Sequence, residues 1–116
     1  MTILIYQFLH ITGIVLIFFG LGGVLMHVIN GGTRQHGFRR LVAITHGIGM
    51  ALVFGAGFGL LAETGVQTPW PAWVYIKIGL WFFFGLALFI SYHFVNQARI
   101  LWWVIPALAE LTIYIA

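Results

Sequence analysis

Four long apolar segments account for almost all of this chain. They run over approximately residues 4–29, 39–62, 72–95 and 100–115, and only short polar turns separate them. A helix of about 20 apolar residues is enough to cross the roughly 30 Å hydrocarbon core of a bilayer. Of the 116 residues, 62% are hydrophobic and 6% are charged, whereas soluble domains carry about 25% charged residues. The sequence therefore predicts an all-α integral membrane protein with four spans and one domain, residues 1–116.

The turns and the basic residues together predict a topology. The turns read NGGTRQHGF, ETGVQTPWP and NQAR, and connections this short make successive helices antiparallel neighbours, as in an up-down four-helix bundle. Four of the five basic residues then fall at the end that carries the first and third turns: Arg34, Arg39, Arg40 and Arg99. The positive-inside rule makes that end cytoplasmic. We expect a multi-pass protein of the bacterial inner membrane with both termini outside, and the few basic residues do not indicate binding to nucleic acid.

Small residues indicate how the helices pack, because helices in lipid associate closely only where small side chains let their backbones approach. The second segment has a stripe with a period of four residues: Gly47, Ala51, Gly55 and Gly59. The first segment has a second glycine row: Gly13, Gly20 and Gly23. We predict that the stripe on the second segment is a packing seam.

Histidines are the most informative polar residues of the apolar segments, which contain His10, His27, His46 and His93. Antiparallel threading brings the last three, from three different helices, to the arginine-rich half. Ionisable side chains inside a membrane are costly and usually functional or paired. Each histidine could instead form a hydrogen bond between helices. His36 lies in the first turn, where we expect it to be solvated.

The histidines predict a haem b site. Cysteine is absent, so any bound metal must rely on other ligands. Membrane b-type haems are held by two histidines at similar depth, with basic residues near the propionates, and the axial ligands tune the redox potential. The ligand candidates are His27, His46 and His93, and the propionate partners are Arg39, Arg40 or Arg99. The predicted function is electron transfer, at most as a membrane oxidoreductase, either as a homo-oligomer or as a subunit of a respiratory complex.

His10 lies in the opposite, outer half, where the chain has no second histidine at its depth. A haem ligand pair there would need a symmetric dimer, a methionine or another subunit. Alternatively, His10 could form a hydrogen bond with a quinone carbonyl. The same half contains Lys77 and Glu110, for which we expect an ion pair, since isolated charges in a bilayer are costly; the alternative is a proton path that also includes Glu63.

Three stretches resemble small bacterial membrane proteins of the SirB and CopD-like kind. They are LHITGIVLIFFGLGG, RRLVAITHGIGMALVFGAGFGLL and WVYIKIGLWFFFGLAL, within residues 8–90. The resemblance implies haem binding or copper handling, and His46 and Lys77 occupy the positions that look most like the family pattern. Copper is less favoured because the three methionines form no motif, and Cu(I) prefers sulfur ligands.

Two other functions are compatible with the same sequence features. One is a non-catalytic accessory subunit, whose glycine ridges and aromatic surface pack against larger partners of a membrane complex. The other is a small metal or proton-coupled transporter that uses the histidine cluster together with Lys77 and Glu110. An enzyme acting on a soluble substrate is not indicated, because the sequence has no nucleophile–base pair and no segment for an extramembrane pocket.

Overall fold

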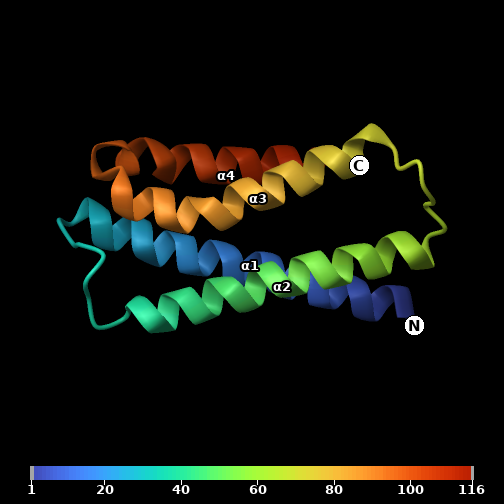
Figure 1. Ribbon diagram of the computed structural model, residues 1–116, viewed down its shortest axis with the longest axis horizontal. Coiled ribbons are helices and arrows are strands. Elements are labelled where there is room, and N and C mark those ends of the chain that lie inside the picture. The colour runs from blue at the N-terminus through green and yellow to red at the C-terminus, as the bar shows by residue number, and fades with distance from the viewer. Residues whose placement is uncertain (1, 116) are drawn as a thin grey trace.

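The computed structural model describes residues 2–115 (Figure 1), and 83% of these residues are helical. The elements are α1 (Thr2–Ile29), α2 (Arg39–Glu63), α3 (Ala72–His93), the short 3-10 helix η1 (Val95–Gln97) and α4 (Ala98–Tyr114). No strand occurs in the described part of the chain. The structure confirms the all-α prediction, the number of long helices and their bounds, which agree to within two residues.

Three of the four helices have the length and composition needed to cross a membrane. They are α1, α2 and α3. By contrast α4 has 17 residues, so at 1.5 Å per residue it is about 26 Å long, against a hydrocarbon core of roughly 30 Å. The predicted fourth span is therefore present as a helix but is shorter than the other three.

The helices run in alternating directions, as the short turns predict (Figure 1). One end of the molecule carries the turn over residues 30–38 together with η1, and the other end carries the turn over residues 64–71. The first helix contacts each of the other three. Two unlike ends result, because the arginines lie near the first of these ends while Glu63 and Glu110 lie toward the second.

The backbones of α1 and α2 come close together at Gly13 and Gly49. A Cβ atom added at Gly49 would lie 2.7 Å from the carbonyl oxygen of Gly13, and one added at Gly13 would lie 2.8 Å from the carbonyl oxygen of Gly49. Because backbone atoms cannot move aside as flexible side chains do, only glycine allows this approach on both helices.

The prediction that the small-residue stripe on α2 is a packing seam is wrong for most of the stripe. Open space surrounds Gly47 and Gly55, Ala51 is exposed, and only Gly59 contacts α1, through Tyr6. The buried positions of α2 are His46, Gly49 and Ala56 instead. Small residues line two faces of this helix, and the partner glycine on α1 decides which face packs. In the α1 row, Gly13 and Gly20 are buried, whereas Gly23 is exposed.

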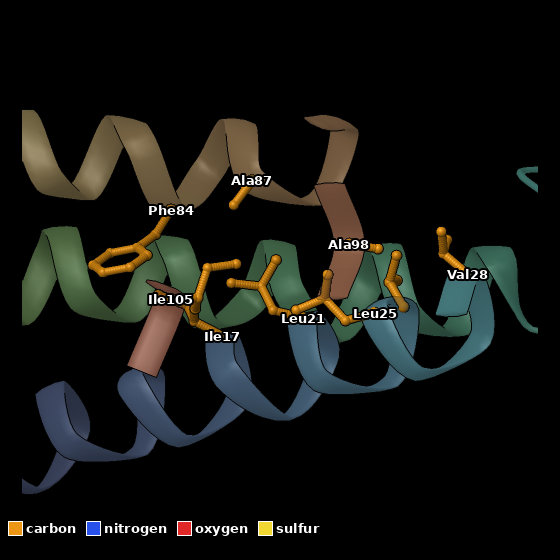
Figure 2. Packing of buried hydrophobic residues seen from close by; sticks show 9 residues of the cluster. Ile17, Leu21, Leu25, Val28, Phe84, Ala87, Ala98 and Ile105 are labelled. Carbon is orange, nitrogen blue, oxygen red and sulfur yellow. The ribbon is translucent and has the colours of Figure 1, made fainter. Parts of the chain in front are cut away.

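The apolar core lies between α1, α3 and α4 (Figure 2). The first helix supplies the largest share, with Ile17, Leu21, Val24, Leu25 and Val28. The other buried members are Phe84 and Ala87 from α3 and Ala98 and Ile105 from α4. Thus α1 packs through backbone contact on one side and through branched aliphatic side chains on the other.

We expect Gly49→Ala to destabilise the protein by about 1–3 kcal/mol, the usual cost of forcing an extra group into a packed site. The matched variant Gly47→Ala has open space around its new methyl group and should be neutral or stabilising by up to about 1 kcal/mol, because alanine favours the helix. Reversible unfolding of the purified protein in detergent, followed by circular dichroism, measures both. Equal effects at the two positions would contradict the assigned seam.

Candidate functional site

His46 links α2 to α3. Its side chain is 4% exposed, and Nε2–H donates a hydrogen bond to the carbonyl oxygen of Phe84 at 3.0 Å. On the opposite helix Gly20 leaves room for it, since a Cβ atom there would lie 3.2 Å from the His46 Cβ atom. A ring nitrogen that donates a proton to a carbonyl cannot bind a metal at the same time. The Nε2 atom of His46 is therefore occupied by a hydrogen bond between helices.

His27 is paired with His36 at the arginine-rich end. Its Nε2–H donates to the carbonyl oxygen of Thr33 at 2.8 Å, and its ring centroid lies 4.1 Å from that of His36. His36 in turn shares a hydrogen bond of 2.6 Å with the hydroxyl of Tyr92. The expectation that His36 is simply solvated is wrong, because the turn folds back over the end of α1 and brings this ring against α3.

His93 remains at the exposed end of α3. Its Nδ1–H donates to the carbonyl oxygen of Phe89 at 3.2 Å, within the same helix, and the two rings are stacked with centroids 4.1 Å apart. The side chain is exposed. His93 contacts neither of the other two predicted ligands through any of these interactions.

The three predicted ligands thus lie in the same half of the bundle but point to different partners. Within residues 2–115 no group of three or more histidines and carboxylates is arranged to hold a metal ion. The predicted propionate partners Arg39, Arg40 and Arg99 are near the turns at this end, at the first turns of α2 and α4. No bis-histidine haem site is evident among the described residues.

His10 has a different environment in the outer half. Its Nδ1–H donates to the carbonyl oxygen of Val53 at 3.1 Å, which fixes the tautomer. In the described part of the chain, Nε2 has no hydrogen-bond partner. In proteins, a ligating histidine usually donates its other N–H to a carbonyl or a carboxylate in this way. His10 is therefore prepared to bind a metal, or to accept a proton or hydrogen bond, through Nε2.

His10 lines a pocket between α1, α2 and α3 with a volume of about 390 Å³. Most of its wall is apolar and aromatic, including Phe54, Phe58, Trp73 and Trp81. The polar side chains on it are Gln7, His10, Thr64 and Lys77. Pockets that bind small molecules share this composition, with apolar walls and a few polar groups that orient the ligand.

Aromatic contacts and one hydrogen bond hold the pocket wall in place. Phe54 lies between Phe58 and Trp81, with ring centroids 4.7 Å apart in both pairs. The indole N–H of Trp81 donates to the carbonyl oxygen of Met50 at 3.0 Å, which ties this part of α3 to α2. The wall is therefore a connected structure that spans two helices.

Lys77 belongs to this pocket and does not pair with Glu110 as we expected. Its Nζ atom lies 5.6 Å from the centroid of the Trp73 ring, a cation–π contact one helical turn away, while Glu110 is exposed on α4. One face of α3 carries Trp73, Lys77 and Trp81, which recur every four residues. This part of the pocket wall could have been predicted from that spacing.

No family model, curated protein or solved structure matches this chain. The resemblance to SirB and CopD-like proteins therefore stays a prediction.

We expect His46→Ala to destabilise the protein by about 1–3 kcal/mol, because it removes a buried hydrogen bond between α2 and α3. The control is His93→Ala, which removes only an exposed bond within one helix and should change stability by less than about 0.5 kcal/mol. Unfolding in detergent measures both variants. A neutral His46→Ala variant would show that the bond to Phe84 does not hold α2 against α3.

Proposed function

We propose that this protein binds haem b in the pocket between α1, α2 and α3, with His10 as the iron ligand, and takes part in electron transfer in the bacterial inner membrane. One observation carries the proposal: Nδ1–H of His10 is held by the Val53 carbonyl while Nε2 remains free in an aromatic pocket. Among the four histidines of the helices, His10 alone combines a fixed tautomer with a place on this pocket.

The pocket residues fit such a group in three respects. The volume of about 390 Å³ lies within the range of ligand pockets, about 300–1,000 Å³, and the open side leaves room for the rest of a macrocycle. Phe54 and Trp81 offer aromatic faces for a planar ring. Lys77 supplies a positive charge for a propionate. The arginines first considered for that role lie toward the other end.

When bound, haem b supplies reversible one-electron chemistry. The chain's own residues have three tasks. The Val53 carbonyl orients the His10 ring and makes Nε2 more basic through the hydrogen bond at Nδ1. The aromatic wall keeps water away from this nitrogen. Lys77 offsets negative charge at the pocket, which in a low-dielectric setting favours retention of an anionic ligand.

The proposal predicts one protein ligand for each chain. Haemin added to the purified protein should give a Soret band, and His10→Ala should abolish it or reduce haem affinity at least about tenfold, since it removes the only bond to iron from this chain. The matched variants His27→Ala, His46→Ala and His93→Ala should keep the band. Visible absorption spectroscopy in detergent measures all five proteins.

If His46→Ala or His93→Ala lost the Soret band and His10→Ala kept it, the haem site would lie in the arginine-rich half instead. A wild-type protein that stays colourless after haemin addition would refute haem binding altogether.

A second candidate ligand for the same pocket is a quinone head group. It is favoured by a pair of complementary groups: His10 Nε2 accepts a hydrogen bond and the Lys77 ammonium group donates one. A quinol hydroxyl could donate to His10, and a quinone carbonyl could accept from Lys77. This ligand would place the chain in the same class of membrane electron-transfer proteins.

For this second candidate we expect a short-chain quinone to quench the fluorescence of Trp73 and Trp81, which line the pocket. Lys77→Met should weaken binding about tenfold or more, because hydrogen bonds from charged groups contribute about 1.5–3 kcal/mol. Arg99→Met, at the other end of the bundle, is the charge control. Equal binding by the two variants would exclude Lys77 from the site. Failure to bind either haemin or quinone would favour the accessory-subunit function.

A further inference from the structure

The turn over residues 30–38 is docked onto the helix ends by a chain of aromatic and polar contacts. His27 closes the end of α1 by donating to the Thr33 carbonyl, and Gly32 lies against its ring. The His36 ring also lies against the His27 ring, with centroids 4.1 Å apart, and His36 reaches Tyr92 of α3 through its hydrogen bond. His36 is thus the residue through which the turn contacts both α1 and α3.

The titratable groups that act on His36 are basic. Arg39 of α2 and His27 of α1 act electrostatically on His36, and Arg34 of the turn lies over the Phe89 ring of α3 at 5.7 Å. Arg34 and Arg39 also act on the Tyr92 hydroxyl. Neither acidic side chain is near, because Glu63 and Glu110 lie toward the other end of the bundle. A positive charge on His36 would meet Arg39 and the protonatable His27, with Arg34 beside its partner Tyr92, and no carboxylate.

We propose that His36 is a pH-sensitive latch: neutral His36 holds the turn over residues 30–38 against the end of α3, and protonation of His36 releases it. Protonation does not remove the hydrogen bond between His36 and Tyr92, since a protonated ring can still donate to the Tyr92 oxygen. The docked state is lost because a new charge is placed against His27 and Arg39 in partly desolvated surroundings.

The direction of the pH effect follows from the docked environment. Partial burial, then His27 and Arg39, lower the pKa of His36 below its ordinary value of about 6.5. A group whose pKa is lower in the docked state stabilises docking above its undocked pKa, and this contribution is lost as the pH falls. The latch should therefore be closed at pH 7.5 and should open progressively below about pH 6.5. The side that senses acidification is the one that carries the arginines.

The test uses two spin labels on the full chain, which has no native cysteine. Gly37→Cys places one on the turn, where open space surrounds an added side chain, and Gln97→Cys places the other on exposed η1 beside the end of α3. Pulsed electron paramagnetic resonance should give a narrow distance distribution at pH 7.5 and a broader, longer one at pH 5.0, with a midpoint below 6.5.

Three variants on the labelled background identify the sensor. His36→Gln keeps a hydrogen-bonding group but cannot take up a proton, so its distribution should stay the same between pH 7.5 and 5.0. Tyr92→Phe removes the docking hydrogen bond and should broaden the distribution already at pH 7.5. The control His93→Gln removes an exposed histidine at the same end and should keep the wild-type transition.

An unchanged wild-type distribution, a midpoint above 6.5, or a His36→Gln variant that still opens would each overturn the latch. None of these results depends on what the pocket around His10 binds.

Discussion

The contact between the backbones of Gly13 and Gly49 is the constraint on which the rest of the molecule depends. It holds α1 and α2 closer than any pair of residues with side chains could be held. This approach brings the Val53 carbonyl within hydrogen-bond distance of His10 and brings His46 beside Gly20. It also turns the opposite side of α1 toward α3 and α4, where the aliphatic core forms. One glycine contact therefore determines both the pocket and the packing.

The fold could be predicted from the sequence because its apolar segments are long and because the turns between them mark the same helix ends. Each apolar segment is far longer than a helical turn, and each turn contains residues that interrupt helices, so the helix bounds agreed to within two residues. The packing face of α2 could not be predicted in the same way. Gly47, Ala51 and Gly55 form a more regular stripe than the true seam, and only the position of Gly13 on another helix distinguishes the two faces.

The candidate site, too, could be predicted from the sequence only in part. Both His10 and Lys77 were identified from the sequence because ionisable residues are rare in apolar helices, and their place in the same half of the bundle followed from the threading. Their common pocket did not, since it depends on the rotation of three helices. The three histidines of the arginine-rich half also lie in one half of the bundle, yet each ring points to a different partner. Depth along a helix is thus readable from sequence, whereas the direction in which a side chain points is set by the neighbours it meets.

The fourth helix is shorter than the other three, which has a consequence for the proposed place of this protein in a membrane. In a bilayer, a segment about 4 Å shorter than the hydrocarbon core produces a hydrophobic mismatch, which is relieved by local thinning of the membrane or by anchoring residues that reach toward the interface. The exposed Trp103 and Tyr114 on α4 are suited to such anchoring. Because α4 lies on one side of the bundle only, the deformation would be asymmetric. The protein would then favour thinner bilayers and orient its α4 side toward regions where the bilayer is already thin.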